Sequence, residues 1–289
     1  MNTFAHRASV VSTTGEFDSL DVILRDYRRR GRIELALVRS RHAELFDTGD
    51  ILAAIVPGID LVVLSQVMFR TGQLIDGLDE IVARAHAAGA RVLLDIYHSL
   101  GVVPLDLAAL DVDYAVGGSY KYLRGGPGAA FLLVSAAQLD AGEGTPDIGW
   151  FAKEAPFRYE RPEPPRFAAG GDGWLESTPP VLTWYQARAG QLFTQAVGVA
   201  RLRSYSQSQQ CKLVGMLAAK GITAHGGTAD RGAFAIVERE DAQRLATALL
   251  GQGIETDARG SHLRICPDLL TTDEEIEGVV AALSGCCAR

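Results

Sequence analysis

Residues 113–129, DYAVGGSYKYLRGGPGA, place a lysine between two tyrosines, directly after an apolar segment and directly before a glycine-rich turn. The apolar segment, Val112–Val116, is predicted to be a strand. Ligands of open α/β sheets bind at the carboxyl ends of strands, so Lys121 is expected at a ligand-binding edge. Burial there lowers the pKa of a lysine and favours imine chemistry. By itself, the pattern is more typical of a surface lysine.

A second strand end lies upstream of this lysine. Residues 93–99, LLDIYHS, place Asp95 at the end of another apolar strand, 26 residues (121 − 95) before Lys121. This spacing is sufficient for a crossover and a return strand, so both strand ends are expected at the same sheet edge. An acid that keeps a pyridine nitrogen protonated and a lysine that forms a Schiff base are the groups that pyridoxal phosphate needs.

Strands and helices alternate through the first half of the chain. The predicted helices are 17–30, Thr48–Val56 and Leu78–Ala88. The predicted strands are 8–13, Ile33–Val38, Asp60–Val67, Arg91–Asp95, Val112–Val116 and Phe131–Val134. This alternation predicts a parallel, doubly wound α/β sheet.

The rest of the chain predicts a different organisation. Proline, glycine and charged residues from Arg158 to Gly173 indicate a long loop, which is typical of a functional or interfacial segment. Two helices are expected next, at Val181–Val197 and Val199–Lys220. After them we expect strands at 233–237, 254–257 and 262–265 and helices at 240–252 and 272–284. The prediction is a large domain over residues 1–197 and a small C-terminal α+β domain over residues 198–289.

Composition excludes several classes of protein. The 289 residues are 47% hydrophobic, which suffices for one large or two unequal domains. A net charge of −7 argues against bulk attraction to nucleic acid or to an anionic membrane. No apolar run reaches the roughly 18 residues of a membrane span, and the N-terminus does not resemble a signal peptide. Four cysteines without C-x-x-C spacing argue against a disulfide framework or a metal site, so a reducing cytoplasm is expected.

Taken together, the motifs resemble kynureninase, a pyridoxal phosphate enzyme of fold type I in the class V aminotransferase superfamily. The resemblance rests on D-x-x-H-S-x-G-x-x-P-x-D-L from Asp95 and G-x-S-Y-K-Y-L-x-G-G-P-G from Gly117. Further matches run in order along the chain and comprise Leu64–Gln73, Gly149–Phe151, Arg166–Pro180, Asp257–Arg259 and Leu263–Arg264. The resemblance implies a mostly parallel sheet of seven-stranded type in a large domain that is truncated at its N-terminus.

The resemblance also implies roles for residues around the cofactor. Lys121 would carry pyridoxal phosphate and later move protons, and Asp95 would pair with the pyridine nitrogen. His98 would contact the ring or its phenolic oxygen. Tyr120 would donate its hydroxyl to the cofactor phosphate and act as an acid, and Ser65 would be a further phosphate or ring contact.

Other implied roles concern the substrate and a second subunit. Arg264 would bind the α-carboxylate of an amino-acid substrate, since a guanidinium suits bidentate binding, whereas Arg259 would be structural. Trp150 and Thr178 would reach the phosphate and substrate region from a partner subunit, which implies a homodimer with a shared active site. Cys266 lies near Arg264 as a desulfurase nucleophile would, but the mobile cysteine loop of desulfurases is not visible.

The sequence departs from the kynureninase pattern near its start. The family's F-P-x-D is represented at best by Phe17-Asp18-Ser19-Leu20, after Thr14-Gly15-Glu16, so its last position is leucine. The loop and helix N-terminus that bind the cofactor phosphate would lie before Asn2-Thr3-Phe4, and nothing there resembles them. The expectation is either a chain that begins late or a short form with weak or no cofactor binding.

Three functions remain open at this point. The first is hydrolysis of the Cβ–Cγ bond of an L-kynurenine or 3-hydroxykynurenine-type amino acid to an anthranilate and alanine, as in tryptophan catabolism. The second is transamination, β-elimination or desulfuration on the same scaffold, which Leu20 and the insert Gly170–Trp174 keep open. The third is a catalytically silent, dimer-forming homologue.

Overall fold

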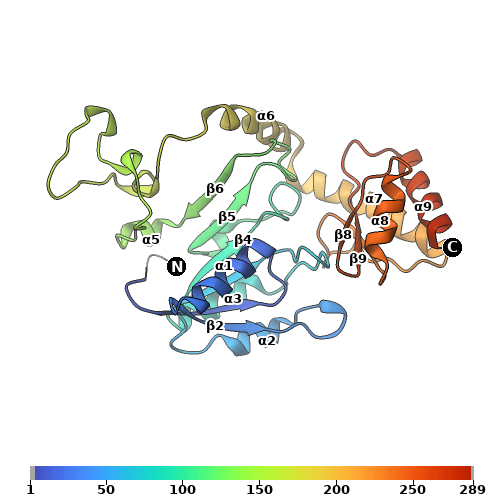
Figure 1. Cartoon of the computed structure of the whole chain (residues 1–289), viewed down its shortest axis with the longest axis horizontal. Coiled ribbons are helices and arrows are strands. Elements are labelled where there is room, and N and C mark those ends of the chain that lie inside the picture. Colours follow the sequence, from blue (N-terminus) through green and yellow to red (C-terminus); the bar gives the residue numbers. More distant parts are fainter. Residues whose placement is uncertain (1–3, 288–289) are drawn as a thin grey trace.

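The computed structural model describes residues 4–287 of the 289-residue chain, so the expectation that concerns residues 1–3 lies outside the described residues. One sheet has the order β2-β1-β3-β4-β5-β6, with every neighbouring pair parallel except β5 and β6 (Figure 1). Its strands are β1 (Ala8–Thr13), β2 (Ile33–Val38), β3 (Leu61–Ser65), β4 (Arg91–Asp95), β5 (Tyr114–Gly118) and β6 (Ala130–Val134).

The mostly parallel α/β sheet is confirmed, and it has six strands within residues 4–287. Each of the six strand segments expected from the sequence forms one strand of this sheet. Within residues 4–287 no seventh segment pairs with it.

Helices connect the strands and cover both faces of the sheet. They are α1 (Asp18–Arg29), α2 (Thr48–Ala54), α3 (Leu78–Ala87), α4 (Leu107–Leu110) and α5 (Ala136–Asp140). Acidic residues in the first turn of α1 and arginines in its last turn both favour the helix dipole. The Asp47 carboxylate accepts a hydrogen bond from the Gly49 N–H and caps α2. These local signals explain why the helix boundaries followed the sequence closely.

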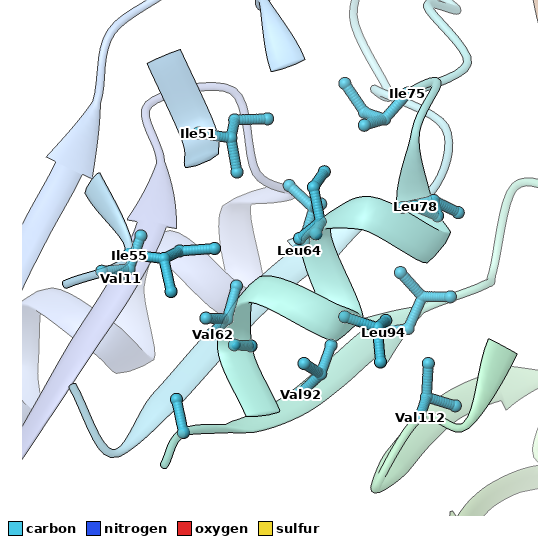
Figure 2. Close-up of a cluster of buried hydrophobic side chains, with 14 of the residues drawn as sticks. Val11, Ile51, Ile55, Val62, Leu64, Ile75, Leu78, Val92, Leu94 and Val112 are labelled. Atoms are coloured by element: carbon cyan, nitrogen blue, oxygen red, sulfur yellow. The ribbon is translucent and has the colours of Figure 1, made fainter. Parts of the chain in front are cut away.

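The central strand β3 is buried along its whole length because helices cover both of its faces. Val62 and Leu64 point to the face covered by α2 and α3, where they join Ile51, Ile55 and Leu94 (Figure 2). Successive residues of a strand point to opposite faces, so Leu61 and Val63 pack on the other face in a second cluster. This two-sided core fixes the position of the strand ends that carry the polar residues described below.

Residues 141–180, here called the excursion, leave the sheet and extend to the left in Figure 1. Their regular structure is limited to three short 3₁₀ turns, η2 (Trp150–Ala152), η3 (Pro156–Arg158) and η4 (Gly170–Trp174). The long α6 (Val181–Val197) follows and meets α7 (Val199–Ala219) at Gly198, whose φ of 89° suits glycine. The long loop expected from Arg158 to Gly173 lies inside the excursion.

The C-terminal part is a small α+β unit at the right of Figure 1. It has an antiparallel sheet of order β7-β9-β8. Its elements are β7 (Ala235–Glu238), α8 (Ala242–Leu250), β8 (Asp257–Arg259), β9 (His262–Ile265) and α9 (Asp273–Cys287). Residues from α7, α8, α9 and the small sheet share one apolar core. The small α+β domain is thereby confirmed, while the division of the chain after residue 197 stays a prediction.

One strand of the small unit lies later than expected. The sequence predicted a strand at 254–257, but β8 begins only at Asp257. Residues 251–254 instead form the turn that follows α8, in which the Ile254 N–H bonds to the Leu249 carbonyl. Pairing with β9, where Asp257 lies opposite Arg264, sets the register of β8. In the part of the chain that is described, no helix has the length and apolar character to cross a membrane.

Candidate functional site

Four parallel strands bring polar residues to one edge of the large sheet. Glu16 lies just after β1, Ser65 ends β3, Asp95 ends β4, and Lys121 follows β5. The register of β3 and β4 places Ser65 directly beside Asp95. Because the carboxyl ends of parallel strands meet at one edge, these residues form a row across the ligand-binding side of the sheet.

Lys121 faces His98 across this edge. Its Nζ lies 2.5 Å from Nε2 of His98. Burial, with the nearby charge of Lys121, lowers the pKa of His98 to about 3, so its imidazole is neutral and accepts a hydrogen bond. Burial and the nearby Arg264 lower the pKa of Lys121 to about 8. Lys121 therefore holds a substantial fraction of neutral, nucleophilic amine near pH 8.

Asp95 is the buried acid beside this lysine. Its side chain is 7% exposed, and its Oδ1 accepts a hydrogen bond of 2.8 Å from the Tyr97 N–H. Burial raises the pKa of Asp95, whereas the Tyr97 hydrogen bond and the Lys121 charge act in the opposite direction. In the described chain, no arginine, lysine or histidine forms an ion pair with Asp95. Its carboxylate is thus available to a cationic or proton-donating group of a ligand.

Arg264 faces Lys121 from the small unit. Its guanidinium bonds to the Asp257 carboxylate and to the Phe69 carbonyl of the large sheet region, and it lies 5.0 Å from the ring centroid of Phe234. Arg259 also pairs with Asp257, at 2.8 Å. A guanidinium has five N–H donors, so Arg264 retains donors for a ligand carboxylate.

A cavity of about 580 Å³ lies between these two groups of residues. His98 and Lys121 line it from the sheet edge, and Phe234, Arg264 and Cys266 line it from the small unit. This volume falls in the usual range for small-molecule sites. An amino acid can therefore meet an amine and a guanidinium in one cavity.

Other residues singled out in the sequence lie outside the lining of this cavity. Tyr120 is half-exposed, with its ring 5.9 Å from that of Tyr97, and burial raises its pKa. Ser65 donates its hydroxyl to Glu16 rather than facing the cavity. Trp150 packs among aromatic side chains of the excursion, and Thr178 is exposed there. The implied roles of these four residues stay predictions.

The sequence reading assigned no role to Glu16, although it is one of the most buried acids of the structure, at 3% exposed. It accepts hydrogen bonds from the hydroxyls of Thr13 and Ser65, at 2.7 and 2.6 Å. Burial raises the pKa of Glu16 to about 7. The only available signal was its position, directly after a strand end that was expected at the ligand-binding edge.

Cys266 is the only cysteine that lines the cavity in residues 4–287. Its thiol lies 3.6 Å from the Tyr122 hydroxyl and donates to the Ala233 carbonyl at 3.4 Å. Burial raises the pKa of this thiol. Because the thiolate is the reactive form, the surroundings of Cys266 favour an unreactive thiol.

A lysine and an acid at the carboxyl edge of a parallel sheet, facing an arginine of a small α+β unit, define the class of fold-type-I pyridoxal phosphate enzymes. Residues 1–281 match the family described as Aminotransferase class-V, and the chain belongs to this family. Members of the family depend on pyridoxal phosphate, so the expected cofactor is confirmed at the level of the family.

Individual relatives agree with this assignment. The chain is 30% identical to a kynureninase of Geobacillus thermodenitrificans over 85% of its own length and 59% of that protein. It is 38% identical to a kynureninase of Xanthomonas axonopodis pv. citri over 57% of its own length and 38% of that protein. It therefore spans less than two thirds of the length of these relatives.

Solved structures show the same fold. The apo cysteine desulfurase of Thermococcus onnurineus superposes with a TM-score of 0.86 at 16% identity, covering 98% of this chain and 73% of the desulfurase. At this identity, the similarity establishes the architecture of the chain. The resemblance to kynureninases found in the sequence is confirmed by the curated relatives.

Proposed function

We propose that this chain binds pyridoxal phosphate on Lys121 and acts on an amino-acid substrate. The observation that carries the proposal is the arrangement of Lys121, with its pKa of about 8 and its Nζ 2.5 Å from neutral His98, beside the buried Asp95. These residues fit the cofactor, because a neutral amine can bond to its aldehyde and an unpaired buried carboxylate can hold the proton of its ring nitrogen.

The residues around the cavity would have different roles in the reaction. Bound pyridoxal phosphate supplies an electron sink next to the substrate Cα. Lys121 would take the proton from Cα, and Asp95 would keep the ring nitrogen protonated. Arg264 would bind the substrate α-carboxylate through the N–H groups that Asp257 and Phe69 leave available. Tyr120 and Ser65 are proposed as further contacts of the cofactor, and His98 as a contact of its ring.

As the reaction, we propose hydrolytic cleavage of the Cβ–Cγ bond of a kynurenine-type amino acid, giving an anthranilate and alanine. The support is the identity to curated kynureninases, 30% over most of this chain, together with a cavity whose wall includes the aromatic Phe234. Release of anthranilate from L-kynurenine or 3-hydroxyanthranilate from 3-hydroxykynurenine, followed by chromatography, tests it. Alanine formed without either product would contradict this reaction.

A second candidate is desulfuration or a related lyase reaction. Cys266 in the cavity wall and the fold shared with a cysteine desulfurase favour considering it. The raised pKa of the Cys266 thiol speaks against a nucleophilic role. Sulfide release from L-cysteine in the presence of a thiol reductant, which would free the sulfur from a Cys266 persulfide, is the test. Release that disappears in Cys266→Ala would support this candidate over the hydrolase.

The first experiment is an absorbance spectrum after addition of pyridoxal phosphate. The unchanged chain and a Lys220→Ala control, which removes an exposed lysine of the small unit, are expected to show a band that borohydride bleaches. Lys121→Ala is expected to lack this band. An identical band in Lys121→Ala would contradict the proposed attachment. Absence of the band from every protein would favour the catalytically silent homologue.

We also propose a homodimer in which Trp150 and Thr178 complete the site of the partner. Both residues lie in the excursion, away from the cavity of their own chain. The excursion and α6 expose large apolar side chains, including Tyr159 at 70% and Leu182 at 84%. Exposed large apolar side chains of this kind are typical of interfaces.

Light scattering tests the dimer directly. The unchanged chain is expected at twice the mass of the monomer, and Leu182→Asp is expected to shift it toward the monomer. If the site is shared, mixing Lys121→Ala with Trp150→Ala is expected to restore part of the activity that each lacks alone. A monomer at every concentration would contradict the proposal.

A cytoplasmic location is proposed on the four free cysteines.

A further inference from the structure

Glu16 is a buried charge that the proposed reaction does not use. Its Oε1 accepts a 2.7 Å hydrogen bond from the Thr13 hydroxyl. Its Oε2 accepts from both the N–H and the hydroxyl of Ser65, at 3.0 and 2.6 Å. Among the described residues, no arginine, lysine or histidine forms an ion pair with Glu16. A buried carboxylate without a cation needs such donors, and three of them converge here.

The negative charge of Asp95 acts on the protonation of Glu16. Ser65 lies opposite Asp95 in the register of β3 and β4, so Glu16, Ser65 and Asp95 follow one another across the sheet edge. Burial raises the pKa of Glu16 to about 7, its hydrogen bonds lower it, and the negative charge of Asp95 raises it further. Lys121 acts on Asp95 from the other side. The charge of Asp95 therefore makes Glu16 hold its proton more tightly.

We propose that Glu16 is a positioning residue of the cofactor-ring site. Glu16 holds Ser65 by two hydrogen bonds, and its protonation state determines how much negative charge lies next to Asp95. Its role toward the cofactor rests on the proposed function. With Glu16 ionised, two negative charges favour a protonated ring nitrogen. With Glu16 protonated, Asp95 alone carries that charge. The groups that face Glu16 are the donors Thr13 and Ser65 and the charge of Asp95.

The coupling is testable without any cofactor. The free energy of unfolding is measured against pH for the unchanged chain and for Glu16→Gln, and the difference between them isolates the titration of Glu16. The same pair is then measured in an Asp95→Asn background. We expect the transition in the difference curve to move to lower pH by on the order of one unit, because a neighbouring negative charge is gone. Equal midpoints in both backgrounds would overturn the proposal.

Two further variants keep this test decisive. Ser65→Ala removes one donor to the ionised Glu16, so we expect the transition to move to higher pH, and it replaces Asp95→Asn if that variant does not fold. An unchanged midpoint in Ser65→Ala would likewise overturn the proposal. Glu34→Gln changes an acid whose side chain is 64% exposed and serves as the matched control, with no such transition expected.

A spectroscopic experiment tests the link to the cofactor. Pyridoxal phosphate is added to the unchanged chain and to Glu16→Gln, and absorbance is followed between pH 5 and 9. We expect both proteins to form the borohydride-sensitive band, with the spectral transition of the unchanged chain near pH 7 lost in Glu16→Gln. Identical titrations would overturn the proposal. Absence of the band from both proteins would instead contradict the proposed function, and the cofactor-free curves would still decide the coupling.

Discussion

The large sheet and the excursion place their apolar side chains in opposite ways. All five residues of β3 are buried, and Leu64 is 1% exposed. In the excursion, Phe157 and Tyr159 are 67% and 70% exposed, and the buried hydrophobic residue is the small Ala152. The sheet is thus stabilised by burial within the chain, whereas the excursion contributes little to the chain's own stability. Its exposed apolar surface is instead suited to contacts with another molecule.

The largest effect is expected in the centre of the sheet. Leu64→Ala leaves a cavity between β3 and the helices α2 and α3, so we expect a loss of about 3–4 kcal/mol in the free energy of unfolding. Leu182→Ala is the matched control, because this leucine is 84% exposed. Denaturant unfolding of a dilute sample measures both. Similar losses in the two variants would break the contrast between the two regions.

Glu16, the buried acid at the sheet edge, is expected to give a pH-dependent change of intermediate size in the free energy of unfolding. The pKa of Glu16 is about 7 in the folded chain against an ordinary value of 4.5, so the folded state holds the proton more tightly. The stability that Glu16 contributes is therefore complete below pH 4.5 and is lost as pH rises through 7.

Glu16→Gln mimics the protonated acid, so it should match the unchanged chain at low pH. Above pH 7 it should exceed the stability of the unchanged chain by about 2–3 kcal/mol. Thermal unfolding across this pH range measures the difference. A stability difference that does not vary with pH would contradict a raised pKa of Glu16 in the folded chain.

A smaller effect is expected where the sheet passes into the excursion. The Ser135 hydroxyl accepts a hydrogen bond from the Gln138 N–H and caps the short helix α5. Ser135→Ala is expected to cost about 0.5–1 kcal/mol, in line with the loss of one partly buried cap. Ser135→Asp keeps an acceptor and should retain the stability, as measured by urea unfolding. A loss of stability in Ser135→Ala as large as that in Leu64→Ala would mean that this junction unfolds together with the core of the sheet.

The smallest effect on the chain itself is expected inside the excursion. Tyr159 stacks on Trp150 with the two ring centroids 6.2 Å apart, yet it is mostly exposed. Tyr159→Ala should change the free energy of unfolding of dilute chain by less than about 0.5 kcal/mol. The same variant should weaken self-association in sedimentation experiments. A clear loss of stability in the dilute chain would mean that contacts within the same chain stabilise the excursion.

Much of the large sheet followed from sequence pattern. Apolar runs separated by helical periods predicted all six strands, and the positions of Asp95 and Lys121 at strand ends predicted that they share an edge. Such signals are local and can be recognised in a single sequence. The start of β8 at Asp257 was missed because its register depends on pairing with Arg264 rather than on local preference.

The site was less accessible to sequence reasoning. Glu16 has no distinctive motif, and its hydrogen-bond partner Ser65 lies 49 residues away in the sequence. The closeness of His98 to Lys121 likewise depends on the packing of two loops. Arg264 faces the cavity, as its match to the family suggested. Trp150 and Thr178 could be placed by resemblance alone, since a residue that acts on a second chain leaves no signal within its own fold.

Arg264 has a consequence for mutational screens. Its guanidinium touches three separate segments, through the Phe69 carbonyl, the Asp257 carboxylate and the Phe234 ring. Removing it would release a bond between the small unit and the sheet region as well as a donor in the cavity. A screen that scores turnover alone would assign both losses to substrate recognition. Scoring protein abundance in parallel separates the two, because the loss of the structural bond lowers abundance even without substrate.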